Sequence, residues 1–196
     1  MKYPLLSAAR AVRKEAAGLL KATSIEAELA QYGEANLIGS YAYDVMVARD
    51  IDFHVIMPQF DLAWVQRFFA YATNSGMFEY ISLHDKHRFN KEAAARYPSN
   101  WALDSYYFGL RLPFAGHEWQ IGVNFLTQPQ EASLEIGRLF ESVTDTQREQ
   151  IVDFKMRLQT RGEKVSSAYV YRAVIQEAIT GFDELLAYLS GLGYSF

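Results

Sequence analysis

The sequence predicts an α/β protein of the α+β kind, with a mixed sheet of about five strands, flanking helices and a C-terminal helical extension. Strand-like and helix-like patterns alternate up to about residue 128, and after Pro129 only helix-like patterns follow. Half of the 196 residues are hydrophobic and 21% are charged, which is typical of a chain that folds around a core. Disorder is therefore excluded as the main state of this chain.

The N-terminal part is expected to begin with helices and to lead into a strand. Alanine and leucine recur at three- and four-residue spacing and predict an amphipathic helix over Leu5–Ala22. Thr23 and Glu26 fit a capping box for a second, short helix. Asn36–Ser40 is too short for a helix and predicts a buried strand that runs into a glycine turn, and a short helical turn is expected over Tyr41–Val47.

The middle of the chain alternates between strand and helix patterns. Polar and apolar residues alternate over Asp50–Met57, which predicts a strand with two distinct faces, closed by Pro58. A helix is expected over Phe60–Thr73 and a third strand over Met77–Leu83. Two more strands are expected to form a hairpin, over Ser105–Leu112 and Glu118–Leu126.

The C-terminal part is predicted to be helical throughout. Helices are expected over Glu131–Ser142, over Asp145–Thr160 behind a capping box of Thr144 and Gln147, and over Ser167–Ser190. We therefore divide the chain into an α/β domain, residues 1–128, and a helical extension, residues 129–196. No linker rich in Pro, Gly and Ser separates them, so the extension is expected to pack on the domain.

Composition excludes several classes of function. The formal net charge is −4 and the pI is about 5.6, which disfavours a nucleic-acid partner. The absence of cysteine excludes disulfides and thiolate chemistry, so any metal is expected to be a hard ion on oxygen ligands. Neither a signal-like N-terminus nor an apolar run of about eighteen residues occurs, and a soluble, cytoplasmic protein without membrane association is expected.

The most informative segment joins a glycine turn to a pair of aspartates. Gly39 and Ser40 end a strand, where backbone N–H groups and a hydroxyl favour phosphate oxygens. Asp50 and Asp52 follow at positions i and i+2 of the next strand and must share a face, about 7 Å apart at Cα. Carboxylates beside a phosphate site are the ligands that Mg²⁺ prefers.

This segment resembles the nucleotidyltransferase superfamily related to polymerase beta, whose hallmark is a strand, Gly-Ser, a short helix and Asp-hydrophobic-Asp. Here the hallmark is Ile38-Gly39-Ser40 and Asp50-Ile51-Asp52, and the resemblance covers roughly residues 25–127. It implies transfer of a nucleoside monophosphate from a nucleoside triphosphate, with ATP expected, to a hydroxyl of a small molecule or protein. Asp50 and Asp52 would be catalytic and would hold Mg²⁺ or Mn²⁺, and Gly39 and Ser40 would bind the nucleotide.

Further cations are expected for the triphosphate. Five basic or imidazole side chains lie between His84 and Asn100, and Arg88 is the candidate nucleotide-binding residue because arginine binds phosphate in a bidentate manner. His54 shares the face of the aspartates, although an ordinary hydrogen-bonded histidine is the alternative. Asp44 is expected to cap or solvate the short turn in which it lies, and Arg49 is expected to point to the face opposite to the aspartates.

The sequence departs from the resemblance at a third carboxylate on a later strand, where Gly122 stands. Glu118 lies about 13 Å away along that strand, and Asp104 could enter from the preceding one. Two alternatives therefore stand beside catalysis. One is a degenerate member that binds nucleotide without turnover, and the other is an interaction protein whose aspartates are solvated.

Overall fold

The computed structural model describes residues 2–86 and 105–196, and it confirms the predicted fold class. Its five-stranded mixed sheet has the order β1-β2-β5-β4-β3, in which β2 and β5 are parallel and the other neighbours antiparallel. The strands are β1 (Glu34–Ile38), β2 (Asp50–Ile56), β3 (Tyr80–Asp85), β4 (Tyr106–Phe114) and β5 (His117–Leu126). The helices are α1 (Pro4–Thr23), α2 (Ile25–Leu29), α3 (Gly39–Ala42), α4 (Leu62–Asn74), α6 (Glu131–Phe140), α7 (Asp145–Thr160), α8 (Ser167–Ile175) and α9 (Phe182–Gly191).

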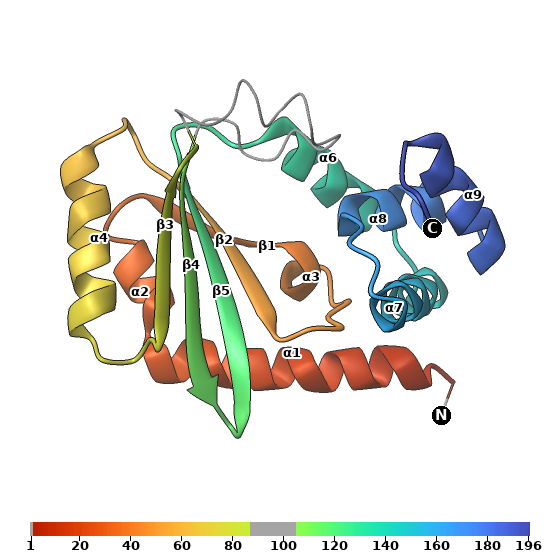
Figure 1. Ribbon diagram of the computed structural model, residues 1–196, viewed down its shortest axis with the longest axis horizontal. Helices are drawn as coiled ribbons and strands as arrows, with labels where there is room; N and C mark the ends of the chain where they lie inside the picture. Colours follow the sequence, from red (N-terminus) through yellow and green to blue (C-terminus); the bar gives the residue numbers. More distant parts are fainter. Residues whose placement is uncertain (1, 87–104) are drawn as a thin grey trace.

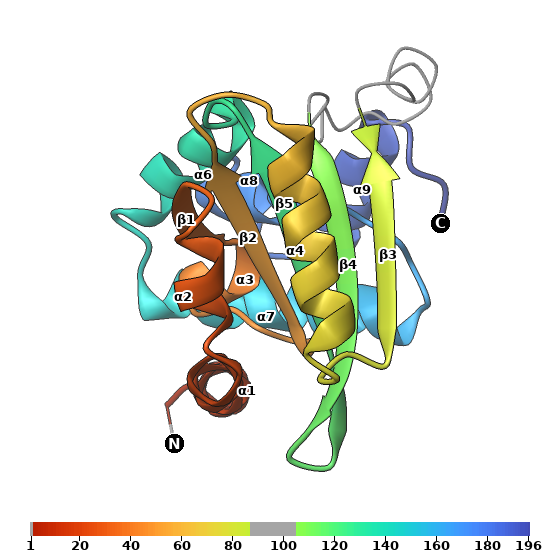
Figure 2. The same ribbon diagram turned by 90° about the vertical axis from the view of Figure 1, so that its left-hand side faces the viewer.

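The sheet lies between two groups of helices. Helices α2 and α4 lie on one side of it, whereas α3 and the C-terminal helices α6 to α9 lie on the other (Figure 1). Figure 2, turned by 90°, shows α4 in front of the sheet. Helix α1 runs beneath both the sheet and the C-terminal helices (Figure 1). The N-terminal helix therefore connects the two halves of the molecule.

Strand alternation sorts the side chains of the sheet into a core face and a second face. Ile51, Phe53 and Val55 of β2 are at most 1% exposed and pack in the core with α4. The alternate apolar positions of β5 also face the core: Trp119, Ile121, Val123 and Phe125 are fully buried. The intervening residues of both strands therefore face the C-terminal helices.

The C-terminal helices form a second core. The predicted capping box of α7 is confirmed, because the backbone N–H of Gln147 donates to Thr144 Oγ1 and the Thr144 N–H donates to the Gln147 side chain. Ala9 of α1 and Val45 of the loop after α3 are buried in this second core. The boundary between residues 128 and 129 stays a prediction.

The structure corrects three local expectations. The capping box at Thr23 is wrong, because the Thr23 hydroxyl donates to the Leu19 carbonyl and Ser24, at φ 51°, separates α1 from α2. The helical turn after the first strand begins at Gly39 and ends at Ala42, earlier than expected. The third strand begins at Tyr80 instead of Met77.

A fourth correction concerns the last predicted helix. Residues 167–190 form two helices, because Ala178 adopts φ 53° between α8 and α9. Helix α9 then starts at Phe182, and its N-cap residue Gly181 donates its N–H to the Glu184 carboxylate. A left-handed residue cannot continue a right-handed helix, so the chain turns here.

No helix within the described ranges is long and apolar enough to cross a membrane. The cytoplasmic location stays a prediction.

Candidate functional site

The glycine turn and the two aspartates meet at one cavity. Strand β2 presents Asp50 and Asp52 on the face opposite to the core, as alternation requires. A cavity of about 800 Å³ lies between this face and helices α6, α7 and α8. Gly39 and Ser40, from the junction of β1 and α3, line the same cavity. The structure therefore brings together the four residues that the sequence analysis assigned to nucleotide and metal, and their roles stay predictions.

Gly39 fits its position for two physical reasons. Its φ is +67°, a backbone conformation that side-chain-bearing residues rarely adopt. A Cβ at this position would also lie 3.2 Å from Oδ2 of Asp52. The glycine thus lets the chain turn into α3 while it passes directly beside the carboxylate.

Gly122 is the register partner of Asp52, and its surroundings are filled. A Cβ on Gly122 would lie 2.6 Å from Asp52 Oδ1 and 3.3 Å from the Tyr107 hydroxyl. The Tyr107 ring also lies over Gly109, the cross-strand partner of Gly122. The place where a third carboxylate was expected is therefore occupied by the aromatic ring of Tyr107.

Two lysines reach the cavity from different elements. Lys86, directly after β3, donates from Nζ to Asn124 Oδ1 at 3.4 Å and lies 4.4 Å from the centroid of the Tyr107 ring. Lys155 of α7 donates from Nζ to the Val45 carbonyl at 3.0 Å. The two ammonium groups are thus held on the sheet side and on the helical side of the carboxylate pair.

The carboxylates and the lysines influence each other's titration. Burial raises the pKa of Asp50, and burial together with the charge of Asp50 raises the pKa of Asp52 to about 7. Burial lowers the pKa of Lys155 to about 8, against the attraction of both carboxylates. Burial also lowers the pKa of Lys86, against the attraction of Asp52. Such opposed shifts are typical of a site where charges are held together out of water.

His54 lies on the same face, one alternate position beyond Asp52. Its side chain is buried, and burial followed by the charge of Lys86 lowers its pKa to about 4. The imidazole is therefore neutral at pH 7. Its register partner is Asn124, so the polar row of the sheet continues across β5. A ligand role for His54 stays a prediction.

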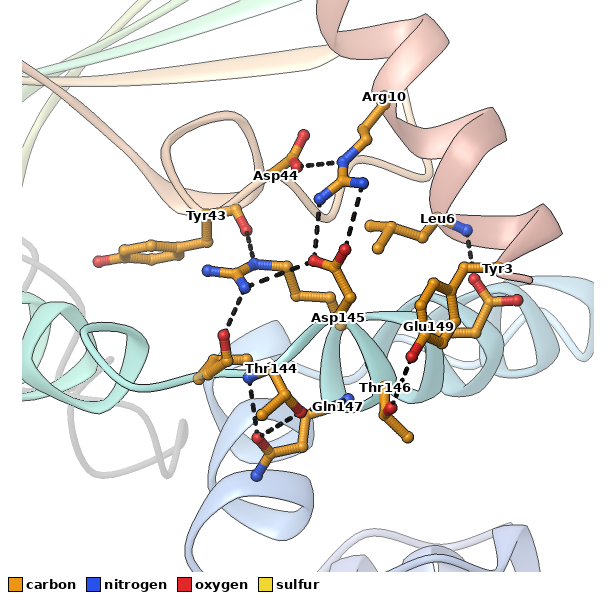
Figure 3. Close-up of polar contacts among 12 residues, drawn as sticks. Tyr3, Leu6, Arg10, Tyr43, Asp44, Thr144, Asp145, Thr146, Gln147 and Glu149 are labelled. Carbon is orange, nitrogen blue, oxygen red and sulfur yellow. Dashed lines mark hydrogen bonds and ion pairs between the residues drawn. The ribbon is translucent and has the colours of Figure 1, made fainter. Parts of the chain in front are cut away.

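The loop after α3 is tied to both α1 and α7 (Figure 3). Arg10 of α1 donates to Asp44 at 2.6 Å and to Asp145 at the start of α7 at 2.9 Å. Arg148 donates from Nε to the Tyr43 carbonyl at 3.3 Å. Asp44 adopts φ 63° and takes part in these ties, away from the carboxylate pair. The glycine turn is therefore fixed from outside the cavity.

The carboxylate pair has the donor atoms that a divalent cation takes, and the binding of such a cation stays a prediction. Oδ1 of Asp50 is buried and has no hydrogen-bond partner among the described residues, which leaves a carboxylate oxygen free to coordinate a metal. Asp52 supplies further oxygen ligands on the same face. No group of three or more His, Cys, Asp or Glu side chains that could hold a metal occurs in residues 2–86 and 105–196. A bound Mg²⁺ would therefore take its remaining ligands from phosphate oxygens and water.

The remaining candidates from the sequence lie outside the site or outside the described ranges. Glu118 has an exposed side chain and lies 3.8 Å from Arg111, so it does not replace the third carboxylate. Arg49 points to the other face, as expected, and pairs with Glu15 at 2.9 Å. Outside the described residues lie Arg88 and Asp104.

Sequence reasoning did not place Lys155 and Tyr107 beside the aspartates, although both line the cavity. Lys155 follows Ile151 by four residues and precedes Leu158 by three, so a lysine stands within the buried stripe of α7. A charged residue within the apolar face of a helix indicates a buried charge, and this pattern could have marked Lys155 as a candidate site residue. The position of Tyr107 over two glycines depends on the register of β4 and β5.

Comparisons with known proteins leave the family open. No family model matches the sequence, and no curated protein matches it. One solved structure with a similar fold is described as the polymerase core of TRAMP, an RNA surveillance complex. It is 17% identical with a TM-score of 0.48, and the match covers 81% of this chain and 50% of that chain. This chain thus spans about half the length of that protein, and at this level the likeness bears on neither family nor activity.

Proposed function

We propose that this protein binds a nucleoside triphosphate, with ATP as the first candidate, and transfers its nucleoside monophosphate to a hydroxyl of a small molecule or protein. The observation that carries the proposal is the convergence of Gly39, Ser40, Asp50 and Asp52 on one cavity of about 800 Å³. A cavity of this size suits a nucleotide and part of an acceptor. The acidic composition disfavours a nucleic-acid acceptor.

The proposed reaction assigns a task to each group. The acceptor oxygen bonds to the α-phosphorus, the bond from that phosphorus to its bridging oxygen breaks, pyrophosphate leaves with the electron pair, and the hydroxyl proton passes to water. Asp50 and Asp52 would hold Mg²⁺ or Mn²⁺, which supplies charge stabilisation at the phosphate oxygens. Ser40 and the adjoining backbone would bind phosphate, and Lys155 would add a positive charge on the helical side.

Thermal unfolding with ligands tests the nucleotide site directly. We expect ATP, GTP, CTP or UTP to raise the melting temperature of the wild type with Mg²⁺ or Mn²⁺ and not with EDTA, since a ligand at 100 times its Kd adds about 2.7 kcal/mol. Asp52→Asn should lose this shift. The same shift in the variant, or none in the wild type, contradicts the proposal.

A second candidate is nucleotide binding without turnover. It is favoured by Gly122, because the described residues provide no third carboxylate there and Tyr107 fills the space. The two candidates differ in product. Release of pyrophosphate together with a nucleotidylated acceptor, detected by mass spectrometry, supports transfer, whereas binding with no product from an acceptor screen supports the second candidate.

A further inference from the structure

The residues around Asp52 are arranged in rows of register partners that run across the strands of the sheet. One row, in register, contains Asp52, Gly122, Gly109 and Ser82, and two of these four positions carry no side chain. Tyr107 stands in the neighbouring row, and its ring extends over both glycines towards Gln120. The phenol ring of Tyr107 therefore packs against the backbone of Gly109 and Gly122, where no side chain intervenes.

Lys86 contacts both the Tyr107 ring and Asn124. Its ammonium group is 4.4 Å from the centroid of the Tyr107 ring and donates to Asn124 at 3.4 Å. Ser105 donates to the same Asn124 oxygen at 3.4 Å, and the Lys86 backbone N–H donates to the Ser105 carbonyl at 2.9 Å. Both the backbone and the side chain of Lys86 are thus fixed at the edge of the cavity.

The two carboxylates and the two lysines that act on them balance in charge without any metal. Asp50 and Asp52 carry two negative charges when ionised, and Lys86 and Lys155 carry two positive ones when protonated. Three further charged residues line the cavity: Glu163 and Lys164 of the loop between α7 and α8, and Arg172 of α8, which pairs with Glu135. One divalent cation already makes the cluster positive, as suits a triphosphate, and a second would meet two ammonium groups with no further carboxylate from the sheet.

We propose that Lys86, positioned by the ring of Tyr107, is a built-in phosphate-binding cation that limits the carboxylate pair to a single divalent ion. The inference rests on the proposed nucleotide site. It adds Lys86 as a phosphate-binding residue and a limit of one divalent ion for each site. In this arrangement Lys86 binds nucleotide phosphate oxygens from the sheet side. Tyr107 is a positioning residue, since it acts through Lys86.

The metal count needs no variant. Equilibrium dialysis of the full chain with Mn²⁺ and saturating ATP should give one Mn²⁺ for each bound ATP. Two Mn²⁺ for each bound ATP overturn the inference and leave the proposed function standing. Absence of ATP binding in the wild type overturns both.

The role of Lys86 is tested by affinity, measured by isothermal titration with Mn²⁺ and ATP. Lys86→Met should bind ATP at least tenfold more weakly and adenosine equally well, whereas Lys86→Arg should retain most of the ATP affinity. Lys14→Met, an equal charge change on the exposed face of α1, should bind like the wild type. Unchanged ATP affinity in Lys86→Met, or an equal loss for adenosine, overturns the inference.

The positioning role of Tyr107 has its own pair of variants. Tyr107→Phe keeps the ring beneath the ammonium group and should keep ATP affinity within about threefold. Tyr107→Leu removes the ring and should weaken ATP binding severalfold without weakening adenosine binding. Equal affinities in the two variants would show that the ring does not position Lys86.

Discussion

Asp52 and Gly122 lie side by side on parallel strands, so close that a Cβ on the glycine would stand 2.6 Å from the aspartate Oδ1. The observed position of the Asp52 side chain therefore requires that residue 122 has no side chain. A Cβ on Gly39 would likewise lie 3.2 Å from the other carboxylate oxygen, Oδ2. The carboxylate is confined between two stretches of backbone, which limits the positions it can take.

Gly122→Ala should destabilise the protein by about 1 to 3 kcal/mol, because the new methyl group overlaps Asp52 and Tyr107 in a filled site. Urea unfolding measures the change. Gly191→Ala is the matched control, since nothing lies within 4 Å of its added Cβ, and it should change stability by less than about 0.5 kcal/mol. In the double variant with Asp52→Ala, the loss at Gly122 should shrink. Strict additivity would contradict the contact.

The stability of the metal-free protein should depend on the protonation of Asp52. Its folded pKa is raised from 3.8 to about 7, so the stability it contributes is fully present below pH 4 and is lost as the pH rises through 7. The difference in unfolding free energy between wild type and Asp52→Asn should therefore fall by about 2 to 3 kcal/mol from pH 5 to pH 8, since each pKa unit corresponds to about 1.4 kcal/mol. His54, whose pKa is lowered to about 4, acts in the opposite direction in both proteins and cancels.

Mg²⁺ should reverse this trend, because it stabilises the ionised carboxylates. Denaturation at several pH values, with Mg²⁺ and with EDTA, checks both statements. A difference that is flat from pH 5 to pH 8 without metal would contradict the buried, mutually repelling pair.

Lys155→Met should weaken metal-dependent nucleotide binding and should move the loss of stability at Asp52 to higher pH. Both effects have one cause, since Lys155 attracts Asp50 and Asp52 and lowers their pKa values. The variant also loses the hydrogen bond to the Val45 carbonyl. Lys164→Met, an exposed residue of the same cavity, is the control and should leave the pH profile unchanged. Identical profiles for Lys155→Met and the wild type would contradict this coupling.

Ala178→Gly should stabilise the protein by about 1 kcal/mol. Ala178 adopts φ 53°, a conformation that costs about 1 to 2 kcal/mol for an L-residue and little for glycine. In one continuous helix over residues 167–190 the same change would destabilise by about 0.5 to 1 kcal/mol. Thermal or urea unfolding of this single variant therefore distinguishes the observed break from the helix that the sequence predicts.

Local sequence patterns predicted the structural features that are set by residues close together in the sequence. Alternation placed Asp50 and Asp52 on one face of their strand, because strand geometry fixes side-chain direction. The Thr144 and Gln147 capping box was predicted for the same reason, since both partners lie within one turn. The break at Ala178 was missed, because alanine favours helices and the reason for the turn lies in tertiary packing.

The rest of the site depends on elements that are distant in sequence. Lys155 enters from α7, and Tyr107 from β4, and their approach to Asp52 follows from strand register and helix packing. Periodicity does not encode these distances. Gly122 was correctly singled out from its strand position. The reason why glycine fits there, which is that Asp52 and Tyr107 occupy the space of a side chain, depends on contacts between strands and is not encoded in the local pattern.

The ties between α1 and α7 also constrain the order in which the molecule assembles. Glu149 accepts from the backbone N–H of Leu5 at 3.1 Å and also from that of Leu6, across more than 140 residues. Such a contact forms late, because a long loop must close before it contributes. On the ribosome, the sheet can therefore take shape while the helical wall of the cavity is still missing. Nascent chains that end before α7 should expose the two aspartates to water and hold no enclosed cavity.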